Sequence, residues 1–207
     1  MAQQITYLIT AATGVTGRAT IAALQADGQQ NIRVLAHRED ERSEQLRKQG
    51  VEVVFGDLLD FHAVRAALQG VKRAYFCFPI APGMVQATTQ FAQAAREVGV
   101  DAIVNMSQKI ARKDAHSHDA FDHWLSERVF DWSGVPVTHL RPTFFTEWLL
   151  YLSPMIQQGT MYVPYGAGKA AFIAGENQGR VIARILQDPK PHQKQVYPLS
   201  GPVEYTF

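Results

Sequence analysis

Thr13-Gly14-Val15-Thr16-Gly17 is the stretch that decides how this 207-residue chain folds. It follows an apolar run at residues 5–10 that predicts a strand, and it opens a helix predicted over residues 15–26. Glycines let a backbone turn tightly and approach a phosphate, while free N–H groups at the start of the next helix attract the anion. The turn predicts a dinucleotide-binding unit in which residues 13–17 and Ala11 contact the cofactor. Ala11 stands where the usual fingerprint has an earlier glycine, and a tight turn without a ligand is the alternative.

Apolar runs and helical stretches alternate on either side of this turn. The runs predict strands over residues 5–10, 32–36, 51–55, 71–78, 102–106 and 137–140. The stretches between them predict helices over residues 15–26, 41–49, 61–68, 84–98 and 121–132. Such alternation indicates parallel strands joined by helical crossovers, with helices covering both faces of the sheet. We therefore expect an α/β fold, a doubly wound parallel sheet of Rossmann type, over residues 1–142.

The rhythm changes after Arg141-Pro142. The remaining pattern predicts helices over 147–157 and 178–187, strands over 170–174 and 195–199, and a glycine-rich turn over 165–168. We expect residues 143–207 to form a small substrate-binding cap on the carboxyl edge of the same sheet. Residues 201–207 show no closing helix, which predicts that this cap is incomplete.

Composition and charge exclude several classes of protein. The chain is 46% hydrophobic and 19% charged, with a formal net charge of +1, so nothing in bulk favours nucleic acid or an acidic membrane surface. No apolar run is long enough for a membrane helix. Cys77 is the one cysteine and lies in an apolar run, which predicts a buried structural thiol in a reducing, cytoplasmic setting. No spacing typical of zinc ligands occurs, so no metal site is predicted. The sequence also lacks a nucleophile elbow and a Walker loop.

The end of the second predicted strand favours one dinucleotide over the other. NAD-binding proteins usually place a carboxylate there, whereas this chain has His37-Arg38. A cation suits the 2′-phosphate of NADP(H), so NADP(H) is predicted over NAD(H). Glu39 and Asp40 follow directly and weaken the inference, and a plain solvated arginine is the alternative.

The next two strands also end in candidate cofactor contacts. Asp57 and Leu58 follow the third strand, where a carboxylate can accept from the adenine amino group. Phe78-Pro79 follows the fourth, where the chain turns across the ribose. Ordinary helix capping and turn formation are the alternatives at both places.

In this order and spacing the motifs resemble those of the NmrA-like group of atypical short-chain dehydrogenases/reductases. The matching stretches are 12–17, 34–38, 56–58, 105–107, 133–135, 140–145 and 171–177. The resemblance implies a domain that binds NADP(H) or NAD(H), followed by a small substrate domain in chains that are usually longer. Some members of the group are reductases of quinones or other small molecules, and others are dinucleotide sensors that regulate a protein partner.

The catalytic pair of short-chain reductases is absent. The sequence has no tyrosine between Tyr75 and Tyr151, and the lysine of the family aligns with Asp122. Ser107, at the end of the fifth strand, is a candidate contact for the nicotinamide carboxamide. His123 is a candidate proton donor because histidine titrates near neutrality, with an exposed pair to Asp119 as its alternative.

Three residues after Arg141-Pro142 complete the predicted site. Thr143 is a candidate for orienting the acceptor, and Phe144 and Phe145 suit a planar substrate, with core packing as their alternative. The sequence thus predicts an NAD(P)H-dependent oxidoreductase that transfers hydride to a small quinone, carbonyl or enone. The alternative is an NADP(H)-sensing regulator that binds a protein partner without turnover. A homo-oligomer is compatible with either.

Overall fold

The computed structural model describes residues 6–160 and 168–206. Of the glycine-rich turn expected over 165–168, only Gly168 lies within these ranges. None of the described helices has both the length and the apolar content to cross a membrane.

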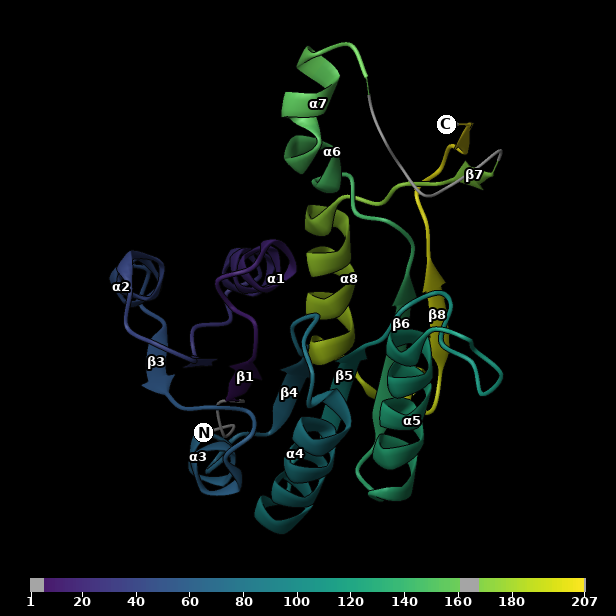
Figure 1. The fold of residues 1–207 in the computed structure, drawn as a ribbon. Helices are drawn as coiled ribbons and strands as arrows, with labels where there is room; N and C mark the ends of the chain where they lie inside the picture. The colour runs from purple at the N-terminus through teal and green to yellow at the C-terminus, as the bar shows by residue number, and fades with distance from the viewer. Residues whose placement is uncertain (1–5, 161–167, 207) are drawn as a thin grey trace.

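A parallel sheet of seven strands forms the centre of the molecule (Figure 1). Its order is β3-β2-β1-β4-β5-β6-β8, and every neighbouring pair is parallel. The strands are β1 Tyr7–Ile9, β2 Ile32–Ala36, β3 Glu52–Phe55, β4 Arg73–Phe76, β5 Ala102–Met106, β6 Val137–Pro142 and β8 Val196–Leu199. The order reverses between β1 and β4, so the predicted doubly wound sheet is confirmed, and its switch point lies beside the glycine turn.

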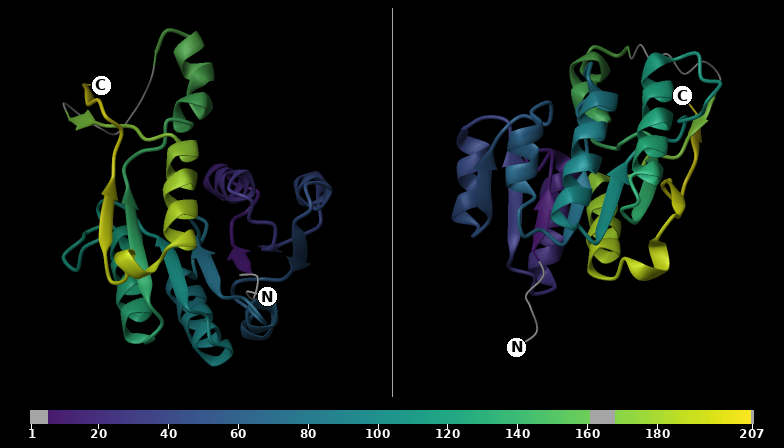
Figure 2. Two further views of the ribbon diagram at one scale, coloured as in Figure 1. Left: turned by 180° about the vertical axis from the view of Figure 1, so that it is seen from behind. Right: turned by 90° about the horizontal axis from the view of Figure 1, so that it is seen from below.

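Helices cover both faces of this sheet (Figure 2). On one face lie α1 Val15–Ala26, α2 Glu41–Lys48 and α8 Gly175–Gln187. On the other lie α3 Phe61–Ala67, α4 Met84–Val98 and α5 His118–Trp132. Side chains alternate along each strand, so Ile103 joins the core beneath α3–α5 while Val104 and Met106 join the core beneath α1 and α8. Two separate cores result, one on each face.

The stretch after β6 departs most from its prediction. The single helix expected over 147–157 is two short helices, α6 Trp148–Tyr151 and α7 Ser153–Gln157, and neither contains a buried residue. Pro154 stands in the first turn of α7, where proline is tolerated because its missing N–H has no helical partner. The strand expected over 170–174 is β7 Lys169–Ala170, which pairs antiparallel with β9 Tyr205–Thr206, a strand the sequence did not predict.

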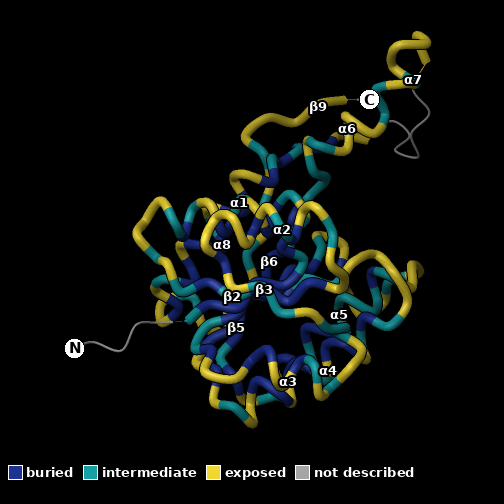
Figure 3. Tube along the Cα trace, turned by 90° about the vertical axis from the view of Figure 1, so that its left-hand side faces the viewer, coloured by how far each residue is buried: buried dark blue, intermediate teal, exposed yellow. Residues whose placement is uncertain are grey.

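Two parts of this last stretch differ in their packing. The helices α6 and α7 project from the body and are largely exposed (Figure 3). In contrast, α8 packs along α1 and over β4 and β5, and β8 extends the main sheet beyond β6. The 3-10 helix Lys190–His192 joins α8 to β8.

Candidate cofactor site

The glycine turn at the start of α1 is built by close packing. Gly14 precedes the helix, and its N–H donates to the carbonyl of Ala11 at 3.0 Å. A Cβ at Gly17 would clash with that same carbonyl and lie 2.7 Å from the Ala12 Cα, so only glycine lets α1 approach the turn this closely. Ala11 has φ +48°, a left-handed conformation that glycine adopts more readily. Alanine at position 11 therefore keeps the backbone conformation of the usual glycine, at some cost in backbone strain.

A cavity of about 540 Å³ opens in front of this turn, where the chain leaves β1, β2, β3 and β4. It brings together most of the predicted cofactor contacts: Ala11, Thr13, Gly14, His37, Arg38, Asp57, Leu58, Phe78 and Pro79. Val15, Thr16 and Gly17 do not line it. Thr16 is buried with its hydroxyl 3.3 Å from that of Tyr75, so its side chain ties α1 to the sheet.

The rim of the cavity beyond β2 carries an uncompensated positive charge. Arg38 is exposed and forms no ion pair within residues 6–160 and 168–206. The two carboxylates that follow it are both occupied. Glu39 binds Arg47 at 2.8 Å, and Asp40 binds Arg42 at 2.7 Å while also capping α2. The acidic neighbours that weakened the prediction therefore do not neutralise Arg38.

Asp57 combines the two interpretations that the sequence left open. Its Oδ1 accepts from the N–H of Leu59 at 2.9 Å, which is ordinary turn chemistry. Its Oδ2 lies 3.6 Å from Nδ1 of His37 across the cavity. The carboxylate thus holds its own loop and still faces the cavity.

Cys77 is a wall residue that sequence reasoning assigned to the core. It is only partly buried and lines the cavity directly after β4. The sequence could have indicated this location, because Cys77 lies at the carboxyl end of a central strand, where the other cavity residues also lie. Burial of the thiol raises its pKa from 9.0 to about 11, so the group is protonated and unreactive at neutral pH.

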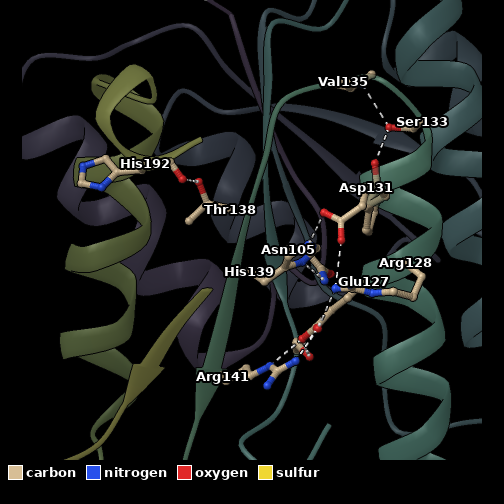
Figure 4. A network of polar contacts seen from close by, with 12 residues as sticks. Asn105, Glu127, Arg128, Asp131, Ser133, Val135, Thr138, His139, Arg141 and His192 are labelled. Atoms are coloured by element: carbon tan, nitrogen blue, oxygen red, sulfur yellow. Dashed lines mark hydrogen bonds and ion pairs between the residues drawn. The ribbon is translucent and has the colours of Figure 1, made fainter. Parts of the chain in front are cut away.

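A second cluster lies under the carboxyl ends of β5 and β6, against α5. The carboxylate of Glu127 is fully buried and accepts from the Ser107 hydroxyl at 2.6 Å. It also accepts from Nε and Nη2 of Arg141 at 2.8 and 2.6 Å (Figure 4). Burial alone would raise the pKa of Glu127, but the hydrogen bonds from Arg141 and Ser107 outweigh it and lower the pKa. Glu127 is therefore an ionised carboxylate whose lone pairs are used within the fold.

His139 continues this cluster along β6 (Figure 4). It is 1% exposed, with Nε2 3.2 Å from Asp131 Oδ1 and Nδ1 3.0 Å from the amide nitrogen of Asn105. The neutral ring with its proton on Nε2 satisfies both contacts, because the carboxylate accepts and the amide donates. Burial lowers the pKa of His139, which agrees with a neutral ring. The sequence showed no sign of this network, since its members lie far apart along the chain.

The predicted catalytic residues are not in the cavity. Ser107 is 3% exposed, and its hydroxyl donates a hydrogen bond to the Glu127 carboxylate, while the Thr143 hydroxyl donates one to the carbonyl of Ala171. His123 is half-buried on α5, and burial lowers its pKa. Within residues 6–160 and 168–206 no ion pair joins His123 to Asp119. The Asp119 carboxylate accepts from the Gln108 amide at 2.7 Å and acts on His123 as a nearby charge that opposes the lowering of its pKa.

The predicted substrate residues belong to an aromatic cluster beside α6. The rings of Phe144 and Phe145 lie 5.5 and 6.2 Å from that of Trp148, and the Phe144 ring lies 6.2 Å from that of Phe172. Both phenylalanines are half-buried. The cluster links the end of β6 to the projecting part of the molecule, and neither ring lines the cavity.

Comparison with known proteins agrees with this architecture. The sequence profile of the NmrA-like family matches residues 3–204. The chain is 30% identical over 198 residues to an NAD(P)H azoreductase of Xenophilus azovorans, covering 94% of this chain and 68% of the azoreductase. It is 27% identical to quinone oxidoreductase 2 of Escherichia coli, covering 96% of this chain and 70% of that protein.

Solved structures show the same fold. An NADPH-dependent quinone oxidoreductase of Escherichia coli, complexed with NADPH, superposes with a TM-score of 0.87 at 25% identity, covering 97% of this chain and 71% of the other. The triphenylmethane reductase of Citrobacter sp., complexed with NADP(H), also gives 0.87 at 24% identity, covering 98% and 72%. The chain thus spans about seven tenths of these two structures.

Proposed function

The chain belongs to the NmrA-like family, and on that premise we propose that it is an NADPH-dependent oxidoreductase acting on a small quinone, carbonyl or enone. The observation that carries the proposal is the cavity at the switch point of the sheet, with Arg38 on its rim unpaired by any residue that the structure describes. Relatives named as an NAD(P)H azoreductase and a quinone oxidoreductase favour catalysis over a purely regulatory role. The cytoplasmic location and the division into domains at residue 142 stay predictions.

The residues of the cavity suit the parts of NADP(H) in turn. Backbone N–H groups at the start of α1, beside Gly14, would hold the diphosphate. Asp57 and Phe78 would face the adenosine, and Arg38 would bind the 2′-phosphate, for which a carboxylate at this position would be repulsive. When bound, the reduced nicotinamide would supply the hydride, and we place it at the carboxyl ends of β5 and β6.

The chain offers orienting groups at that end rather than a strong acid. Because the Ser107 hydroxyl already donates its one hydrogen bond to Glu127, the Ser107 oxygen is left to accept a hydrogen bond. The Thr143 hydroxyl is likewise committed to Ala171 as a donor. We propose that Ser107 orients the cofactor and that Thr143 orients the acceptor. We also propose that His123, whose pKa is lowered by burial, stays neutral and is a weak hydrogen-bond donor. An acceptor whose oxyanion can take its proton from water, such as a quinone, fits this arrangement best.

The test begins with binding. NADPH and NADH are titrated into the purified chain, and energy transfer from the tryptophans to the reduced nicotinamide is followed. We expect NADPH to bind more tightly, and then to be oxidised when quinones or enones are added. Failure to bind either nucleotide would refute the proposal, whereas binding without turnover of any acceptor would favour the dinucleotide-sensing regulator.

A further inference from the structure

Gln178 is a buried polar side chain whose amide is left unpaired by the part of the chain that the structure describes. It is 0% exposed, and neither its amide oxygen nor its amide nitrogen has a hydrogen-bond partner within residues 6–160 and 168–206. An unpaired buried amide destabilises a fold, because its groups lose their hydrogen bonds to water and gain none. Such a residue calls for an explanation beyond packing.

The position of Gln178 on α8 follows from the helix contacts. Ile182 and Ile185 of α8 join the core formed by Met106 and Leu140 of the sheet. Residues four and seven positions apart share a helix face, so Gln178 also faces the sheet, one turn before Ile182.

The direction of α8 places Gln178 at the carboxyl edge. Arg73, which begins β4 at the opposite edge of the sheet, donates to the carbonyls of Leu186 and Gln187 near the end of α8. The helix therefore runs antiparallel to the strands, and its first turn lies beside their carboxyl ends (Figure 1).

The first turns of α8 and α1 meet at this edge. Gly175 packs so tightly on Val15 that a Cβ at Gly175 would clash with that side chain. The N–H of Gly175 is already taken by the Glu147 carboxylate at 2.9 Å, so this helix end is occupied by an anion of its own. What remains for a ligand is the neutral amide of Gln178, which presents one acceptor and two donor hydrogens.

The cavity and the helix α8 meet neighbouring strands of the sheet. The lining of the cavity ends at Phe78 and Pro79 after β4 and includes no residue of α8, while α8 packs over β4 and β5. A dinucleotide held by the α1 turn and extended past β4 would bring its nicotinamide to the ends of β5 and β6, next to the first turn of α8.

We propose that Gln178 binds the carboxamide of the nicotinamide ring. Its Nε2 donates to the carboxamide oxygen and its Oε1 accepts from the carboxamide N–H, so that each orphaned atom gains a partner. The inference rests on the proposed binding of NADP(H) and adds the residue that recognises the reactive end of the cofactor.

The test compares NADPH with its reduced 3-acetylpyridine analogue, in which an acetyl group replaces the carboxamide and the N–H donor is lost. Dissociation constants are measured for the unmodified chain, for Gln178→Met and for Gln178→Leu. We expect the preference for NADPH over the analogue to fall about three- to tenfold in both variants, the range for one lost hydrogen bond. Melting temperatures should stay unchanged or rise, because an unpaired amide has been removed.

Gln90→Met is the matched control. Gln90 lies on α4, on the opposite face of the sheet, and its Oε1 is also buried with no partner among the described residues. This variant should leave the ratio of the two dissociation constants unchanged. An unchanged ratio in both Gln178 variants, with NADPH still bound, would overturn the assignment of Gln178 alone. Failure of the unmodified chain to bind NADPH would overturn the proposed function and this assignment together.

Discussion

The two ends of the carboxyl edge of the sheet satisfy their charges in opposite ways. At the β2–β3 end, Arg38 is exposed and unpaired within the described ranges, and it faces an open cavity. At the β5–β6 end, Glu127 is fully buried and accepts three hydrogen bonds from Ser107 and Arg141. A charge left open to solvent remains available to a ligand, whereas a buried charge must be paired inside the fold. The first end is therefore open to the ligand that we propose, and the second holds the strand ends in place.

The largest effect is expected from breaking the buried end. Glu127→Ala removes the carboxylate and leaves the Arg141 guanidinium without its partner. Loss of one partner of a buried ion pair costs about 3–5 kcal/mol, and we expect the free energy of unfolding to fall by that order. Urea unfolding measures it.

Glu97→Ala is the matched control for Glu127. Glu97 also accepts from an arginine, Arg65 at 2.8 Å, and from Gln93 at 2.9 Å, but at the surface. Exposed pairs contribute about 0–1 kcal/mol. Equal losses in the two variants would mean that burial does not distinguish the two ends of the sheet.

The second prediction concerns the turn at the open end. Gly17→Ala places a methyl group against the Ala11 carbonyl and the Ala12 Cα, which are backbone atoms that cannot move aside cheaply. We expect a loss of about 1–3 kcal/mol in unfolding free energy, together with weaker NADPH binding. Gly14→Ala meets the same carbonyl only at 3.2 Å, so its effect should be smaller. Reversal of this order would contradict the packing that we describe.

The third prediction tests the exposed charge itself. Arg38→Ala should weaken NADPH by about 10- to 100-fold while leaving NADH nearly unchanged, because only NADPH has the 2′-phosphate. Arg42→Ala should do less, since the Arg42 guanidinium is already bound to Asp40. Fluorescence titration with both nucleotides gives the ratios. If NADPH and NADH weaken equally, the 2′-phosphate is bound elsewhere.

The smallest effect is a pH dependence from the buried end. Burial lowers the pKa of His139 below 6.5, so the unfolded chain binds more protons just below that pH. The contribution of His139 is complete above pH 6.5 and is lost as the pH falls through the window below it. Glu127, with its pKa lowered from 4.5, adds a further loss at more acidic pH.

His139→Gln isolates the contribution of the histidine. A glutamine amide can donate to Asp131 and accept from Asn105, as the neutral ring does, but it does not titrate. We expect unfolding midpoints of this variant to change less between about pH 7 and pH 5.5. His123, whose pKa is also lowered, keeps its part of the slope. An identical slope in the variant would remove His139 as a cause.

Local patterns predicted the open end well, because it is built from short stretches that each end a strand. The glycine turn, Arg38, Asp57 and Phe78 all follow directly after predicted strands, and parallel strands bring their carboxyl ends to one edge. The departures come where local pattern is weakest. The helix expected over 147–157 is divided just before Pro154, which has no N–H to continue the first helix, and neither half buries a residue.

The sequence by itself determined the doubly wound sheet, the glycine turn and the position of Arg38 after β2, because periodicity and glycine spacing act over a few residues. Only the tertiary structure decided which polar groups pair. Ser107, Glu127 and Arg141 lie on three elements, and packing of α5 on the sheet brings them within hydrogen-bond distance. In the sequence Gln178 is an ordinary polar residue. Packing of α8 on β5 buries its amide, which has no partner among the described residues.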